Sequence, residues 1–503
     1  MDGHKVFEHT RFMSPNYSSF DLSRIRRTSL KMGPLVPVYL EEILPGDMFK
    51  VKSEIMLRLS PMVTPVMERV NVWMHYFFVP NRIIWNQWED FITGGREGTS
   101  APVFPTYQWE DLQPSPGGSG GDSSLVDYLG LPSAPFDGTS GQTISKLPFW
   151  AYQQIYNDYY RDQNLEEEID YTGSGGLVLR NRAWEKDYFT SALPWTQRGA
   201  EVEIPLTGSG TATYNAVSDL YRSGGAAADG NLTADTGDLF DGTDNVRVEN
   251  IDEITVDGIN IDINELRRSS AIQRFLERNA TGGARYIEMI YSHFGVKSSD
   301  SRQQRAEYLG GGRQPVVISE VLNTSNTAEA AQGTMAGHGI AVGGDNKFRR
   351  KFEEHGYVIG IMSVLPRTGY QQGIPKHFLR RDKLDYYWPD LANLGEQAIQ
   401  NNELYFNDAA SAATNEAAFG YTGRYNEYKF GMSTVHGEFR STLDTWHMGR
   451  KFTGLPPLNN DFVKSDPTTR IFAVETGDTL WAQVYNEVHA RRPMPFFADP
   501  RLS

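Results

Sequence analysis

Apolar and polar residues alternate along a stretch near the N-terminus, Phe49–Leu59. A period of two residues predicts a β-strand with one buried and one solvated face. A second stretch, Val70–Val79, carries aromatic and β-branched residues on both faces and stops at Pro80, so it predicts a more deeply buried strand. In the first stretch the buried face would carry Phe49, Val51, Ile55, Leu57 and Leu59, and the solvated face Lys50, Lys52, Glu54 and Arg58.

Helices are predicted at two places. Aromatic residues recur at intervals of three and four positions within 149–164. In the second helix, 264–278, Asn264 can cap the start, and Gly282-Gly283 follows the end. Further strand candidates lie at 246–256, 315–322, 356–365, 424–430, 435–441, 470–475 and 480–488. Many short strands, few helices and loops of unequal length favour a mainly β fold, an antiparallel sandwich or jelly roll with long loop insertions.

Composition restricts the kinds of chemistry available. The 503 residues include no cysteine, which excludes disulfides, thiolate metal sites and cysteine nucleophiles. No window approaches 18 uninterrupted apolar residues and the N-terminus lacks an apolar signal segment, so we expect a soluble protein without membrane insertion. The segment 93–148 is rich in Gly, Pro and Ser and reads as a long loop.

Charge is distributed unevenly along the chain, whose net charge is −15. Residues 224–265 hold eleven acidic residues against one basic residue, Arg247. Residues 1–33 show little periodicity, predict an extended arm, and hold six basic residues against three acidic ones. Such an asymmetry suits a shell with a nucleic-acid side and a solvent side.

The candidate nucleic-acid contact is the basic arm. Arginine and lysine neutralise phosphates, and neighbouring aromatic rings can stack on unpaired bases without reading their sequence. The residues proposed for this contact are Tyr17, Phe20, Arg24, Arg26, Arg27 and Lys31.

A search for catalytic and metal motifs gives little. Gly117–Gly121 satisfies the GxSxG pattern around Ser119, but a polar, low-complexity loop replaces the strand and helix that a nucleophile elbow needs. The aspartates within 235–262 do not have the spacing of an EF-hand, and the dispersed histidines predict no metal site. We therefore expect no catalytic residue, metal or cofactor, and not an enzyme.

A set of short sequence segments, spread over most of the chain, resembles the major capsid proteins of the Microviridae, especially the gokushovirus-like branch. The segments follow one another in the same order as in that family. They are Pro37–Asp47, Tyr76–Arg82 with Trp85 and Trp88, Tyr159–Asn164, Asp187–Trp195, Leu276–Arg278, Gly282–Tyr286, Ser292–Gly295, Glu307–Gly312, Glu354–Tyr357, Tyr370–Gly373, Leu394–Gln397 and Arg492–Pro495.

The resemblance implies an eight-stranded jelly roll that assembles into the simplest icosahedral shell around the circular single-stranded DNA of a tailless bacteriophage. Residues 1–33 would be an internal arm, and 34–503 one capsid domain with insertions at 93–148, 207–262 and 264–314. Implied partners are further copies of the chain, the DNA, a small basic phage peptide and a scaffolding protein. The implied location is the virion, assembled in the bacterial cytoplasm.

Two surface roles follow as hypotheses. The acidic insertion 207–262 is either a host-attachment surface that meets a receptor or a solubilising loop. Contacts between subunits are expected at 93–148, at 264–314 and at the C-terminal arm 491–497, where Met494, Phe496 and Phe497 would be a liability if left exposed. Two rival functions stay open at this point: a glycan-binding or glycan-cleaving β-sandwich, and a trimeric receptor-binding spike.

Overall fold

The computed structural model describes residues 16–112, 121–132, 141–200, 202, 212–214, 220–222, 232–235, 238–241, 244–248, 254–256, 263–283, 285–324 and 332–497. Two compact units are present: residues 1–196 with 281–503 form the first, and residues 197–280 form the second. Ser119 and most of the insertion 207–262 lie outside the described residues.

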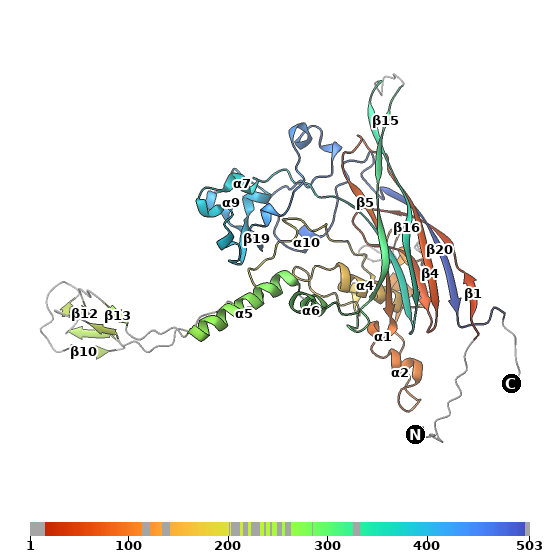
Figure 1. Ribbon diagram of the computed structural model, residues 1–503, viewed down its shortest axis with the longest axis horizontal. Coiled ribbons are helices and arrows are strands. Elements are labelled where there is room, and N and C mark those ends of the chain that lie inside the picture. Colours follow the sequence, from red (N-terminus) through yellow and green to blue (C-terminus); the bar gives the residue numbers. More distant parts are fainter. Residues whose placement is uncertain are drawn as a thin grey trace. The chain divides into compact units, whose positions relative to one another are not determined.

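Two antiparallel sheets form the centre of the first unit (Figure 1). The large sheet has the order β1-β20-β4-β16-β15, and β2 pairs with the same edge of β20 as β1 does. Its strands are β1 (Ser18–Asp21), β2 (Arg24–Leu30), β4 (Met48–Leu59), β15 (Val317–Leu322), β16 (Met335–Lys351) and β20 (Leu480–Arg492). The small sheet has the order β14-β5-β17-β3, with β3 (Val36–Ile43), β5 (Val70–Pro80), β14 (Glu307–Pro315) and β17 (Gly356–Pro366).

The main core fills the space between these sheets. Alternate residues of β4, beginning at Phe49 and Val51, are buried against alternate residues of β5 such as Met74 and Tyr76. The predicted alternation of Phe49–Leu59 is therefore confirmed. Buried polar contacts cross this apolar layer: Ser53 of β4 contacts both the hydroxyl of Tyr76 and the side chain of Asn486 in β20, and Asn486 donates to the carbonyl of Val38 in β3.

The second face of the small sheet is also covered. Phe77 and Val79 of β5 pack in a second cluster with Phe149 and Tyr152 of α4. Burial on both faces explains why Val70–Val79 lacks a clean alternation. The covering segments are α1 (Asn81–Ile84), α2 (Trp88–Thr93), α3 (Leu125–Tyr128), α4 (Leu147–Ile155), which continues as a π-helical turn at Tyr156–Tyr160, and the pair β6 (Thr106–Gln108) and β7 (Thr143–Ser145).

A third cluster, around Phe189, Ile399 and Phe462, includes residues of α8 (Asn401–Leu404), α10 (Asn460–Val463) and the pair β18 (Glu396–Gln400) and β19 (Ala418–Gly423). The first unit also contains α6 (Tyr286–Phe294), α7 (Lys376–Leu379), α9 (Ala412–Glu416) and short 3₁₀ turns.

The second unit contains short antiparallel strands and one long helix, α5 (Ile263–Gly282). The predicted helix 264–278 is confirmed, and it ends at Gly282 as expected. Both strands predicted within 246–256 exist, but β12 pairs with β9 and β13 pairs with β8. The strands are β8 (Ala212–Tyr214), β9 (Leu220–Arg222), β10 (Leu232–Asp235), β11 (Asp238–Asp241), β12 (Asp244–Val248) and β13 (Ile254–Val256).

Some local predictions were wrong. The segments 424–430 and 435–441 form 3₁₀ turns, at Asn426–Tyr428 and Gly437–Arg440, because Tyr425 and Gly437 take left-handed backbone angles that interrupt an extended run. The segment 470–475 contributes only an isolated bridge at Phe472. Residues 18–30, expected as an extended arm, are strands β1 and β2 of the large sheet. The overall class, mainly β with antiparallel sheets and helical insertions, is confirmed.

Candidate nucleic-acid interface

The outer face of the large sheet, opposite the core, is divided into two halves of different chemistry. Strand alternation directs every second residue of β4, β16 and β20 onto this face. A register shift in β16 between Gly343 and Asn346 lies between the halves. We call one half the basic patch, formed by Lys50, Lys52, Lys347, Arg349, Lys351 and Arg491, and the other the apolar patch, formed by Ile25, Met56, Val342 and Trp481.

Like charges face one another across the strands of the basic patch. Lys347 lies opposite Lys52, and Arg349 lies opposite Lys50. Such pairs destabilise a sheet, so an anion bound there would relieve the repulsion. The patch surrounds a hollow of about 380 Å³ whose floor includes Val51 and Phe348.

Few acidic groups compensate this charge. Glu54 accepts a 2.7 Å hydrogen bond from Lys52, which raises the pKa of that lysine. Glu487 lies opposite Lys52 on β20. Among the described residues, none gives a hydrogen bond or ion pair to the side chains of Lys50, Lys347, Arg349 or Lys351. These four cations are available for an external anion.

The apolar patch adds a half-exposed aromatic ring to this face. Trp481 is 49% exposed and lies in register with Arg58. Together with Arg27 and Met56 these residues line a hollow of about 530 Å³. An indole ring between arginines offers a stacking surface for an unpaired base next to cations for its phosphate.

Of the six residues predicted to contact nucleic acid, two lie on this outer face. Arg27 lines the apolar hollow, and the Tyr17 ring lies 5.0 Å from the guanidinium of Arg491. The side chains of Arg24 and Arg26 point to the other side of the sheet. Their role as phosphate ligands stays a prediction.

Arg24 and Arg26 have partners within the chain. Arg24 bonds Glu41 at 2.7 Å and the carbonyl of Leu40 at 2.6 Å. Arg26 donates to the carbonyl of Tyr128, and burial lowers the pKa of its guanidinium. Lys31 lines a separate hollow beside Asp122 and Asp478.

The C-terminal arm packs against the first strand. Phe20, predicted to contact nucleic acid, stacks on Phe496 with ring centroids 5.7 Å apart. Phe496 in turn contacts Phe497 at 4.9 Å, and both rings are exposed, whereas Met494 is half-buried. The subunit-interface role of Met494, Phe496 and Phe497 stays a prediction.

Sequence reasoning missed most of the basic patch. The polar side of the first predicted strand, Lys50 and Lys52, was assigned to solvent. Strand β16 was not predicted because glycines break its pattern, although its end, Lys347–Lys351, carries four bases in five positions. That run was the available signal, but only the pairing of β16 with β4 shows that its charges join those of Lys50 and Lys52.

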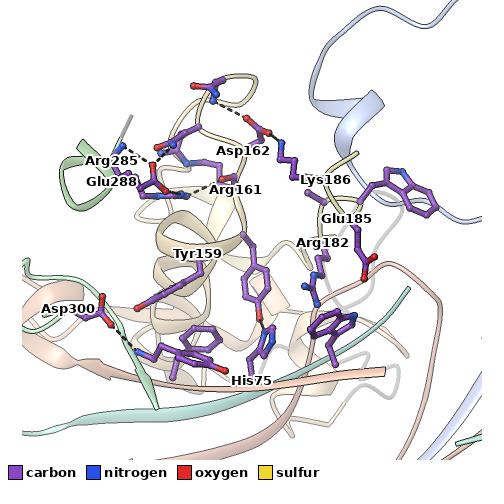
Figure 2. A pocket seen from close by; sticks show the side chains of 18 of the residues that line it. His75, Tyr159, Arg161, Asp162, Arg182, Glu185, Lys186, Arg285, Glu288 and Asp300 are labelled. Atoms are coloured by element: carbon purple, nitrogen blue, oxygen red, sulfur yellow. Dashed lines mark hydrogen bonds and ion pairs between the residues drawn. The ribbon is translucent and has the colours of Figure 1, made fainter. Parts of the chain in front are cut away.

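A second candidate site is a pocket of about 970 Å³ over the small sheet (Figure 2). Trp73, His75 and Phe77 of β5 form its floor, and the end of the π-helical turn with the following loop to residue 164, together with the loop 182–186, forms much of its wall. The guanidinium of Arg182 lies 4.5 Å from the ring of Trp73, and burial lowers the pKa of Arg182.

Four of the charged groups that line this pocket form two ion pairs with one another. Asp162 accepts from Lys186 at 2.5 Å, and Glu288 lies 3.2 Å from Arg285. Figure 2 shows both pairs on the wall, away from the aromatic floor. The arrangement suits binding of a polar ligand or chain segment rather than acid–base chemistry.

Protonation of His75 should control stability at acidic pH. Its Nδ1 lies 2.8 Å from the Tyr160 hydroxyl, and burial lowers the pKa of the imidazole to about 4. The unfolded chain takes up this proton near pH 6.5, and the folded chain does so only near pH 4. The contribution of neutral His75 to the free energy of unfolding is therefore fully present above pH 6.5. The free energy of unfolding falls between pH 6.5 and 4, by on the order of 2–3 kcal/mol.

Denaturant unfolding of the wild type, His75→Phe and His377→Phe at pH 7 and pH 4.5 checks this expectation. His75→Phe should lose part of the pH dependence, and the exposed His377 should not matter. An unchanged pH dependence in His75→Phe would show that other groups cause the acid sensitivity.

Two further searches cover the described part of the chain. There, no three His, Asp or Glu side chains gather in a way that could hold a metal ion. Within the same residues, no helix has the length and apolar character needed to cross a membrane.

Comparison with known proteins gives consistent results along the whole chain. The sequence model of the family described as "Capsid protein (F protein)" matches residues 13–502. The chain is 33% identical to "Capsid protein VP1" of Chlamydia phage 1, over 96% of this chain and 95% of the relative. It is 36% identical to the VP1 of Bdellovibrio phage phiMH2K, over 96% and 95%. It is 30% identical to the VP1 of Spiroplasma virus 4, over 94% and 93%.

Proposed function

Because the chain belongs to the capsid protein (F protein) family, the major capsid proteins of the Microviridae, we propose that its copies form a small T=1 icosahedral shell that encloses circular single-stranded DNA. Family membership implies a structural, non-enzymatic role in the virion and assembly into a multimeric shell. The enclosed DNA and the symmetry of the shell are parts of the proposal.

The strand order supports an eight-stranded jelly roll as the building block. One sheet contains β2-β20-β4-β16, and the facing sheet contains β3-β17-β5-β14. In this assignment β1 continues the β2 edge and β15 extends the other edge. This assignment moves β2 from the expected arm 1–33, and β14 from the expected insertion 264–314, into the jelly-roll domain. The proposed insertions into that domain are then 93–148, 207–262 and 264–306.

The basic patch is the observation that carries the DNA part of the proposal. A chain with a net charge of −15 keeps six bases on one face of a regular sheet, two pairs of them directly opposed. Unpaired cations in one half of this face, and Trp481 between Arg27 and Arg58 in the other half, suit a flexible polyanion with exposed bases. We propose that this face lines the interior of the shell.

Partners of the shell belong to the same proposal. Six bases per copy neutralise only part of a genome's phosphates, which leaves room for a small basic phage peptide. A scaffolding protein and assembly in the bacterial cytoplasm complete the proposed pathway.

The acidic insertion 207–262 is proposed to contribute to host attachment. It belongs largely to the separate compact unit 197–280, and its sequence is strongly acidic. Particles from which 207–262 is deleted should adsorb less to host cells, and unchanged adsorption by intact particles would leave the segment as a solvated loop.

Electron microscopy of the purified protein, with sedimentation and an absorbance ratio for nucleic acid, tests the main proposal. We expect closed isometric particles that protect single-stranded DNA from nuclease. Pentamers or small rings that close when phage partners are co-expressed would support a scaffold requirement. A monomer or trimer that persists with those partners present would contradict the shell and favour a spike.

A further inference from the structure

The hairpin formed by β15 and β16 leaves one edge of the large sheet unpaired. Strand β15 pairs with residues 335–340 of β16, and the rest of β16 pairs with β4. In Figure 1 the hairpin extends beyond the neighbouring strands at one end of the sheet. Among the described strands β15 is the last in its sheet, so main-chain groups along its outer side have no strand partner.

This edge lacks the features that usually prevent strands from pairing between molecules. Natural edge strands carry lysine, proline or a bulge, but β15 has the sequence Val-Ile-Ser-Glu-Val-Leu. Val317 is 67% exposed and Val321 is 53% exposed. Its one charged residue is Glu320. An apolar, unprotected edge of this kind favours addition of another strand.

The sequence of β15 is complementary to itself when two copies run antiparallel. A two-fold axis perpendicular to the sheet places opposite residues on the same face. With the axis at Ser319, Val317 lies opposite Val321 of the second copy, and Ile318 lies opposite its Glu320. With the axis at Glu320, two carboxylates would oppose each other, which is unfavourable. Axes at Ser319 and Glu320 are the two that pair five residues of the six-residue strand, and charge favours Ser319.

The hairpin is also anchored within its paired region, so little order need be gained on pairing. Gly337 of β16 exchanges two hydrogen bonds of 3.1 Å with Met62. A side chain at Gly337 would approach the Thr64 carbonyl to 2.5 Å, so the close contact requires glycine. The Ser319 hydroxyl additionally bonds the carbonyl of His338 at 3.3 Å.

We propose that β15 pairs antiparallel with β15 of a second copy across a two-fold axis, with Ser319 opposite Ser319 of that copy. The two large sheets then join into one continuous sheet. This inference rests on the proposed shell, because it assigns one of the subunit contacts that a shell requires.

A single introduced cysteine gives a direct test, because the chain has none of its own. Opposed residues of an antiparallel pair have Cα atoms roughly 4.5–5.5 Å apart, which a disulfide can span. Ser319→Cys particles should form covalent dimers upon mild oxidation, seen on a non-reducing gel. The matched control is Val342→Cys, an exposed position in the part of β16 that pairs with β4, away from the sheet edge. This variant should form no covalent dimer.

Charge pairs test the register independently. In the double variant Val317→Lys, Val321→Lys, each new lysine of one copy faces a new lysine of the second copy. This repulsion should lower the particle yield at least tenfold. Val317→Lys with Val321→Glu opposes lysine to glutamate and should restore most of that yield.

Wild-type particles separate failure of this inference from failure of the shell proposal. If the wild type forms shells, absence of Ser319→Cys dimers and normal assembly of the double-lysine variant would overturn the pairing. If the wild type forms no closed shell with phage partners present, the shell proposal fails. Ser319→Cys dimers would then still support the paired edge.

Discussion

Replacement of Phe352 by alanine is expected to lower the free energy of unfolding of the unassembled chain by about 3–5 kcal/mol. The ring is 2% exposed and lies between the two sheets. Its centroid is 4.7 Å from that of Phe78 in β5 and 6.1 Å from that of Phe49 in β4. The backbone around it is fixed by two hydrogen bonds to the turn at Gly46 and Asp47, so we expect little collapse into the cavity.

Denaturant unfolding of Phe352→Ala beside Phe378→Ala measures this effect. The control removes an equally large ring that is mostly exposed, and it should change stability by no more than about 0.5 kcal/mol. Equal loss in both variants would show that packing between the sheets is not the main source of stability.

Reversal of three charges in the basic patch is expected to have the largest effect on DNA. The variant Lys347→Glu, Arg349→Glu, Lys351→Glu removes three candidate phosphate contacts and leaves the buried side of β16 unchanged. Affinity for single-stranded DNA should fall about a hundredfold or more at moderate salt, and the salt slope of binding should decrease by roughly 2. Fluorescence anisotropy with a labelled oligonucleotide measures both quantities.

The matched control changes net charge by the same amount elsewhere. Arg381→Glu, Lys383→Glu, Lys429→Glu alters three exposed bases outside the large sheet. We expect its DNA affinity to stay within about threefold of the wild type. A similar loss in both triple variants would mean that net charge alone, and not the basic patch, governs binding.

Sequence reasoning predicted best those elements whose pattern is local and long. Strand β4 alternates over its whole length and α5 ends at a glycine, so both were found close to their true bounds. The predicted cap was wrong, because Asn264 is the second residue of the helix. Strand β16 was missed because its glycines serve close contacts, such as Gly337 against Thr64, that depend on distant residues. The strand predictions at 424–430 and 435–441 were wrong for the opposite reason, because there a local pattern was misleading. Their short aromatic runs imitate a strand, and one left-handed residue changes the outcome.

The candidate interface was predictable only in part. Arg27 and Tyr17 lie on the expected face, but alternation sends Arg24 and Arg26 inward. The densest bases come from strands far apart in the sequence, and only their register shows that Lys347 faces Lys52. A count of charges along the chain cannot reveal such a surface.

The place of β20 in the large sheet links folding to protein synthesis. The last strand of the sheet to be synthesised lies between two of the earliest, β2 and β4. At ribosomal speeds of about 5–20 residues per second, a nascent chain waits roughly 20–90 s between completing β4 and completing β20. During that time β2 lacks its partner β20, and β4 lacks β20 throughout and β16 until residue 351 has been made. A chain that ends before β20 cannot complete the large sheet, so we expect truncated copies to keep these strand edges unpaired.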